Sequence, residues 1–281
     1  MRSLSLIGLF SPAFVFASSE GVKPAATDLF DIAGVPISNS ILTTWIIAAL
    51  IIIGVRLAVG TPKLIPGKGQ AVVEGMAQGL RDALEPIVGK QMIGKTFPLL
   101  CGFFVFILLM NWSGLLPGVG TIKFHTAAGW QDAIRPANSD LNSTFALSVL
   151  SFVAWTYFVL RYAGFKVLVF DLFGNKADKK EVGMLMWVLL VPIFFAVGGI
   201  EVVSIAFRLI SLSFRLFGNV FGGENLIHAL GGIAPYVAPA LAGLLEVLVG
   251  VIQAFVFTLL SAVYIGLICN HEGGHDDEHA H

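Results

Sequence analysis

Five long apolar runs divide the chain into candidate membrane spans. A helix needs about 20 predominantly apolar residues to cross the hydrocarbon core of a bilayer. Runs of about this length or longer lie at residues 41–59, 97–117, 144–162, 184–228 and 234–269. The last two are nearly twice as long as required, so each must tilt or bend. The segment Gly231–Pro235, rich in Gly and Pro, separates them, and the pattern predicts a helical hairpin made of the last two spans.

A further helix is predicted between the first two spans. Residues 70–92 mix apolar and charged residues at helical spacing, which is typical of a helix that lies on a membrane surface.

The distribution of lysine and arginine predicts the orientation, because these residues concentrate in cytoplasmic loops. The loops after the first and third spans hold the most: Lys63, Lys68, Arg81, Lys90 and Lys95 in one, and Lys166, Lys176, Lys179 and Lys180 in the other. The loop after the second span carries only Lys123 and Arg135. We therefore expect the surface helix and the C-terminus in the cytoplasm and the N-terminus outside.

Composition supports a polytopic, all-α membrane protein. Charged residues make up 12% of the chain, against about 25% in soluble domains, and mean hydropathy is +0.85. The net charge of -1 gives no reason to expect nucleic acid as a partner. We expect three regions: an outside, signal-like segment at 1–40, a single membrane domain at 41–270 and a polar cytoplasmic tail at 271–281.

The first 17 residues have the pattern of a signal peptide, with Arg2, an apolar run and a small residue at Ala17. Cleavage after Ala17 and retention of the segment are both compatible with this pattern. The tail holds several His and acidic residues, so it either binds a metal ion weakly or is a solvated charged tail.

One stripe of the fourth apolar run collects polar and small residues. At 100° per residue, eight residues point within about 60° of one direction: Glu201, Ser204, Arg208, Ser211, Arg215, Gly218, Asn219 and Gly222. Gly218 and Gly222 form a small-xxx-small pair, which allows another helix to approach closely. Arg215 stands out, because a charge at bilayer depth costs about 3 kcal/mol and needs a partner. The stripe is either a contact surface for another protein or the place where Arg215 pairs with Glu246 of its own chain.

The fifth run carries a sparser polar face. Glu246, Gly250 and Gln253 align at helical spacing. A carboxyl and an amide one above the other can relay protons through water, although Gln253 could equally form a hydrogen bond between helices. Glu224 lies on the side of its helix opposite to Arg215, where it could face a separate aqueous cavity.

Several chemistries are excluded or unsupported. The chain has no Gly-rich loop ending in Gly-Lys-Ser/Thr, and no His/Cys cluster with metal-ligand spacing lies in the apolar runs. We therefore expect no cofactor, no intramembrane metal and no enzymatic activity of the isolated chain.

These residues resemble subunit a of F-type ATP synthases. The most specific match is Ser213-Phe-Arg-Leu-Phe-Gly-Asn219, followed by Gly-Gly-Glu224-Asn-Leu. Three more segments match in the order of the family: Asn111–Pro117, Pro136–Thr144 and Gln253–Phe257.

The resemblance implies a membrane stator that conducts protons through two half-channels to and from a rotating c-ring. Arg215 matches the essential arginine that faces the ring carboxylate. The other matched positions are polar residues of the proton pathway, namely Asn219, Glu224, Gln253, Glu201 and Arg208. Glu246 departs from the enterobacterial pattern, which has histidine there, but other members have glutamate. The implied partners are the c-ring, the b subunits of the peripheral stalk, the remaining synthase subunits and the lipid of a bacterial inner membrane. The sequence does not decide between H⁺ and Na⁺, and the carboxyl-and-amide lining favours H⁺.

Two other classes of function were weighed. A secondary transporter would carry an ion or solute through its own C-terminal hairpin, but such folds show paired repeats, and here the polar residues crowd into the hairpin alone. A structural scaffold would leave the charges in the two overlong helices unexplained.

Overall fold

A computed structural model describes most of the membrane domain. The described residues are 26–32, 35–116, 119, 123–126, 129–132, 134–165, 179–232 and 237–269. The expected leader at 1–17, the tail at 271–281 and residues 233–235 of the expected turn lie outside them.

Five described helices are long and apolar enough to cross a membrane, which confirms a multi-pass, all-α membrane protein. They are α1 (Asn39–Val59), α3 (Lys90–Trp112), α4 (Leu141–Phe158), α6 (Lys179–Gly231) and α7 (Val237–Cys269). A helix between the first two spans also forms, as α2 (Lys68–Val88). Short helical turns occupy Ser113–Leu115 (η1), Ala137–Ser139 (η2) and Val159–Ala163 (η3).

Two element boundaries differ from expectation. The second span begins at Lys90, seven residues before the apolar run, and α2 ends at Val88 instead of continuing to residue 92. Gly89 separates the two helices with a φ of 88°, a left-handed conformation that favours glycine. The two lysines in the first turns of α3 extend the helix beyond its apolar part.

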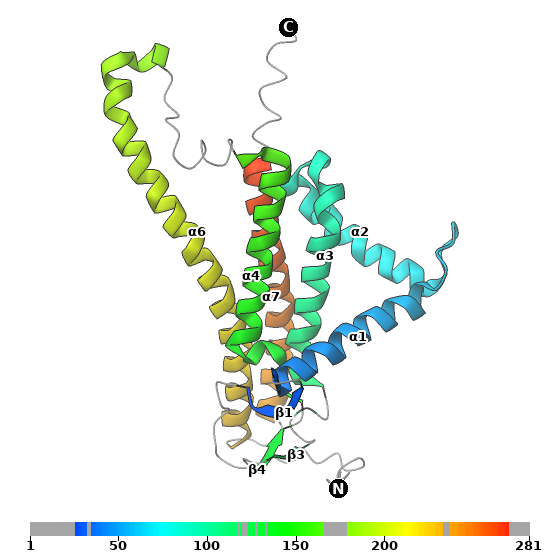
Figure 1. The fold of residues 1–281 in the computed structure, drawn as a ribbon. Coiled ribbons are helices and arrows are strands. Elements are labelled where there is room, and N and C mark those ends of the chain that lie inside the picture. Colours follow the sequence, from blue (N-terminus) through cyan, green and yellow to red (C-terminus); the bar gives the residue numbers. More distant parts are fainter. Residues whose placement is uncertain are drawn as a thin grey trace.

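The helices form a central bundle with two oblique arms (Figure 1). Helices α3, α4 and α7 stand side by side, and α6 packs against α4 and α7 along its lower half and then diverges from them. Helix α1 leaves the bundle obliquely, and α2 returns to it. Only 6% of the most apolar stretch of α6 is buried, against 33% in α7. Most of α6 is therefore available to lipid or to another protein.

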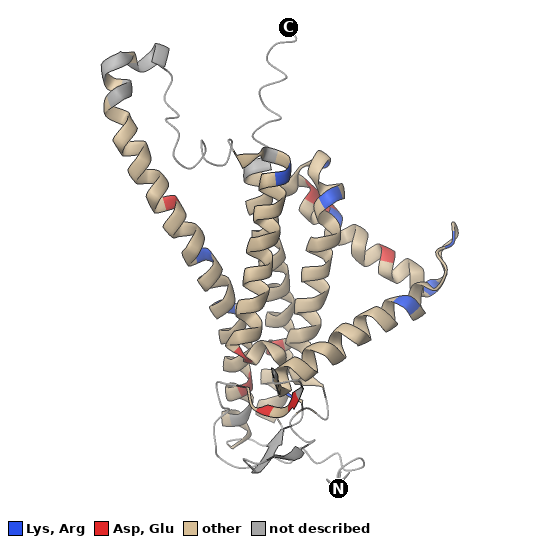
Figure 2. Ribbon diagram, viewed as in Figure 1, with Lys and Arg blue, Asp and Glu red and all other residues tan. Residues whose placement is uncertain are grey.

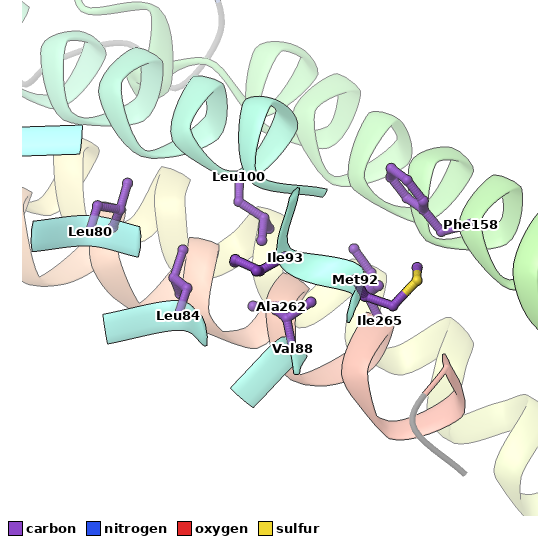
Figure 3. Close-up of a cluster of buried hydrophobic side chains, with 9 residues drawn as sticks. All are labelled: Leu80, Leu84, Val88, Met92, Ile93, Leu100, Phe158, Ala262 and Ile265. Atoms are coloured by element: carbon purple, nitrogen blue, oxygen red, sulfur yellow. The ribbon is translucent and has the colours of Figure 1, made fainter. Parts of the chain in front are cut away.

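An apolar cluster attaches α2 to the bundle. Figure 3 shows Leu80, Leu84 and Val88 of α2 pointing toward residues of α3 and α7. Leu84 and Val88 lie four residues apart and therefore on one face of the helix. Both are completely buried. Helix α2 is thus amphipathic as expected; its place on the cytoplasmic membrane surface stays a prediction.

Two β-hairpins were not expected. Strands β1 (Asp28–Ile32) and β2 (Val35–Ser38) pair antiparallel, as do β3 (Lys123–Thr126) and β4 (Gly129–Asp132). Both hairpins lie at the end of the bundle where α4 begins, and we call this the hairpin end (Figure 1). Strands of four or five residues are too short for their alternation to be recognised in a sequence.

Basic residues gather away from the hairpin end. Figure 2 shows that most of the Lys and Arg positions coloured on the ribbon lie at the opposite end of the bundle and at the α1–α2 connection. The distribution agrees with the expected cytoplasmic side, and the orientation itself stays a prediction.

We expect Gly266→Val to destabilise the docking of α2 on α7. A Cβ at position 266 would clash with the backbone carbonyl of Ile87, which cannot rotate away as a flexible side chain could. Overpacking of this kind costs about 1–3 kcal/mol. Thermal denaturation in detergent should show a lower midpoint for this variant. Gly102→Val is the matched control, because a Cβ there meets nothing within 4 Å; equal midpoints for the two variants would contradict the close approach.

Candidate functional site

The inner face of α6 is anchored so that Arg215 points outward. Leu212, Leu216 and Val220 recur every four residues and are buried, which directs this face into the bundle. Between them, Ser213 Oγ lies 3.2 Å from Thr144 Oγ1 of α4. Arg215 belongs to the other face and is exposed.

Arg215 has no carboxylate partner in the described part of the chain, because none lies within 4.0 Å of its guanidinium. The pair with Glu246 that the sequence left open therefore does not form here. The rest of the polar stripe is exposed too, apart from the half-buried Arg208. The stripe is thus an outer surface of the chain with a cation in it.

Glu246, by contrast, points into the helical hairpin formed by α6 and α7. Its residue is 8% exposed, and its carboxylate lies against the backbone of α6 at Gly223. A Cβ added at Gly223 would come within 2.7 Å of Glu246 Oε1. The absence of a side chain at position 223 therefore creates the space that the carboxylate occupies.

Three of the sequence-predicted residues meet at one small cavity. Asn219 Nδ2 donates a hydrogen bond to Gln253 Oε1 at 2.8 Å, so Gln253 does link α6 to α7. Glu246 lines the same cavity, whose volume is about 10 Å³. This is close to the space that one water molecule needs. The cavity thus brings a carboxyl group and two amides together beside the helix that carries Arg215.

Two buried asparagines complete this region. Asn111 of α3 lines the cavity and donates from Nδ2 to the carbonyl of Gly250 at 3.1 Å. Asn138 of η2 donates in turn to Asn111 Oδ1 at 2.8 Å. Both stand in segments that carried the family resemblance, but their sequence positions alone gave no reason to assign them a role.

Two buried polar atoms at this region have no hydrogen-bond partner among the described residues, namely Asn138 Oδ1 and Gln253 Nε2. Buried polar groups are almost always hydrogen-bonded to protein or to ordered water. Water is the expected partner of both atoms.

Glu224 lies on a different side of α6, as its spacing from Arg215 predicted. Its Oε2 is 3.9 Å from Nη2 of Arg135, a residue that the sequence analysis treated only as a loop charge. Arg135 is 8% exposed. The nearby Asp140 accepts hydrogen bonds from Ser40 Oγ at 2.8 Å and from the backbone N–H of Asn142 at 3.2 Å. Glu224, Arg135 and Asp140 are therefore held by specific partners at the hairpin end.

Glu201 and Arg208 form a separate group further along α6. Arg208 Nη2 is 3.8 Å from Glu201 Oε1, and its guanidinium carbon is 3.5 Å from the centre of the Tyr264 ring. This distance allows a cation–π interaction. Tyr264 is another residue to which the sequence gave no role.

A second cavity, of about 30 Å³, opens beside Arg208 between α4, α6 and α7. Its lining includes the hydroxyl groups of Ser151 and Ser261, which lie 2.9 Å apart. The volume is enough for two water molecules. Two of the cavities lined by described residues therefore lie next to polar side chains of α6, one beside Arg208 and one beside Asn219, and Arg215 lies between these two residues along the helix.

Comparison with known proteins agrees with this arrangement. The family model described as ATP synthase A chain matches residues 41–266. An ATP synthase subunit a of Moorella thermoacetica is 32% identical over 245 residues, which cover 87% of this chain and 95% of that protein. The ATP synthase subunit a of Geotalea daltonii is 34% identical over 229 residues, or 81% of this chain and 86% of the relative. The chain therefore belongs to the ATP synthase A chain family.

Proposed function

We propose that the chain is the stator subunit of the Fo sector of an F-type ATP synthase and conducts protons to and from a c-ring. The observation that carries this proposal is the position of Arg215, which is exposed on an apolar helix and has no carboxylate partner among the described residues. A cation at bilayer depth needs a counter-charge. A carboxylate on a neighbouring subunit would supply it.

The chemistry of the coupling step follows from the cost of charge in lipid. A ring carboxylate must be neutral while it faces lipid, because its ionised form is too costly there. Next to the guanidinium of Arg215 the ionised form is favoured by the opposite charge. The carboxylate therefore releases its proton on approach and takes up a new one on leaving. Net proton flow then requires the ring to turn.

The two polar cavities are candidates for the two half-channels. The cavity lined by Asn219, Glu246 and Gln253 lies toward the hairpin end, which we expect to face outside. The cavity beside Arg208 and Tyr264 lies toward the expected cytoplasmic side, where Glu201 continues the polar stripe. The positive charge of Arg215 between them would oppose direct passage of a proton from one to the other.

The proposal includes the setting in which the chain works. We infer a bacterial inner membrane, with the N-terminus outside and the C-terminus in the cytoplasm. The partners are the c-ring on the exposed face of α6, the b subunits and the remaining synthase subunits. The chain alone would catalyse no reaction. Family membership disfavours the alternative of a secondary transporter.

We expect Arg215→Ala to abolish ATP-driven acidification of inverted membrane vesicles, because the ring carboxylate loses its counter-charge. Fluorescence quenching of a pH-sensitive dye measures the acidification, and immunoblotting of the extracted complex checks assembly. Arg81→Ala is the matched control, since its side chain is 46% exposed on α2 and pairs with Glu85 of the same helix. Normal pumping by an assembled Arg215→Ala complex would contradict the proposal.

Arg215→Lys should also impair pumping severely although it keeps the positive charge. Lysine is a compact, strongly hydrated point charge that loses its proton more readily when desolvated, whereas the guanidinium stays protonated and has a planar set of donors. The expected result is at least a tenfold lower initial rate of quenching with normal assembly. A rate near that of wild type would show that charge alone is sufficient.

Gln253→Leu should lower pumping several-fold, because it removes the hydrogen bond to Asn219 and one polar wall of the cavity while nearly keeping the side-chain volume. Initial quenching rates at equal amounts of complex measure the effect. Gln78→Leu serves as control, because this exposed amide donates to Asp82 on the same helix. If both variants pump equally well, the cavity at Gln253 is not part of the path.

A further inference from the structure

Arg135 is a buried cation held in a fixed position. Its Nε donates to Ser139 Oγ at 2.8 Å, and its Nη2 donates to the Ser139 carbonyl at 3.3 Å. Its backbone N–H donates to Thr43 Oγ1 of α1 at 3.3 Å. These bonds fasten the residue to η2 and to α1, so the direction of the guanidinium is set by two other elements.

The guanidinium faces the carboxylate of Glu224 on α6. The two side chains are 10% and 17% exposed, and Arg135 Nη2 is 3.9 Å from Glu224 Oε2. This distance is too long for a direct hydrogen bond, so the contact is an attraction between opposite charges. Because water is largely excluded, salt screens the attraction only weakly. Removal of either partner would deprive the other buried charge of this attraction.

The same short turn connects this ion pair to the polar cavity. Asn138 follows Arg135 by three residues, and its amide donates to Asn111, which lines the cavity with Glu246. On α6, Gly223 lies against the carboxylate of Glu246, and the next residue is Glu224. Two successive residues of α6 at the hairpin end are therefore involved: Gly223 contacts one acidic side chain, that of Glu246, and Glu224 carries another, which faces Arg135.

We propose that Arg135 is a positioning residue for ion translocation: it holds the Glu224 carboxylate against η2, at the hairpin end of the proposed path, and balances its charge. The inference rests on the proposed function. It assigns different roles to the two arginines. Arg135 satisfies a carboxylate of its own chain, whereas Arg215 remains available for a carboxylate of another subunit.

The test is a double-mutant cycle in cells that make the full complex. The variants are Arg135→Gln, Arg135→Lys, Glu224→Gln and the double variant Arg135→Gln/Glu224→Gln, with Arg81→Gln as the control for loss of an exposed cation. ATP-driven acidification of inverted vesicles is measured for each. The amount of the subunit retained in the detergent-extracted complex is measured in parallel, so that the cycle gives a result even where a variant does not pump.

We expect Arg135→Gln to lower pumping or retention at least fivefold, because it removes the positive charge that faces the Glu224 carboxylate. The same change should cost less than twofold when Glu224 is already glutamine, since position 224 then has no negative charge for Arg135 to balance. Arg135→Lys should keep at least half of the wild-type value because it keeps the charge. Arg81→Gln should have no effect.

Three results would overturn the inference: a normal Arg135→Gln variant, equal losses in the two Glu224 backgrounds, or a lysine variant as impaired as the glutamine variant. A purely structural role of the Arg135–Ser139 bonds predicts the last two. Vesicles from the Arg215→Ala variant are measured in the same experiment. They distinguish failure of this inference from failure of the proposed function. If Arg215→Ala abolishes pumping while Arg135→Gln is normal, only the role of Arg135 is wrong.

Discussion

The arrangement of this protein depends on one constraint: a polar side chain within the thickness of a membrane must find a partner, because lipid offers none. Most of the buried polar groups satisfy this constraint inside the chain. The asparagines of α3 and η2 bond to one another and to α7, and Arg135 faces Glu224. Arg215 is exposed on an apolar helix and has no carboxylate partner among the described residues, and a partner of this kind is what an assembly interface can supply.

Glycine determines how closely these polar groups approach one another. At Gly250, a Cβ would lie 3.2 Å from side-chain atoms of Asn111 and Trp112, so the bare backbone allows α3 to come close enough for the bond from Asn111. Trp112 Nε1 also donates to a carbonyl of α7, that of Val247, at 3.2 Å. The hydrogen bonds between α3 and α7 thus depend on a residue that contributes no side chain.

Periodicity was sufficient to predict the spans, the amphipathic α2 and the opposite orientations of Arg215 and Glu224 on α6. Each of these is a property of one helix, which the spacing of residues fixes. The partners of Glu224 and Arg208 could not be predicted, because Arg135 and Tyr264 are distant in sequence and meet them only after the helices pack. The β-hairpins were missed because they are short. The bond between Asn219 and Gln253 was one of two open alternatives, and only the packing of α6 on α7 shows that it forms.

A substitution of Gly223 would affect the direction of a neighbouring side chain more than the stability of the fold. A methyl group there would meet the end of the flexible Glu246 side chain, not a backbone atom, so the helices could stay in place while the carboxylate swings elsewhere. The residue at position 223 of α6 therefore determines in which direction the Glu246 carboxylate of α7 points. An apparently conservative exchange of glycine for alanine could redirect the chemistry of the cavity without altering a single polar residue.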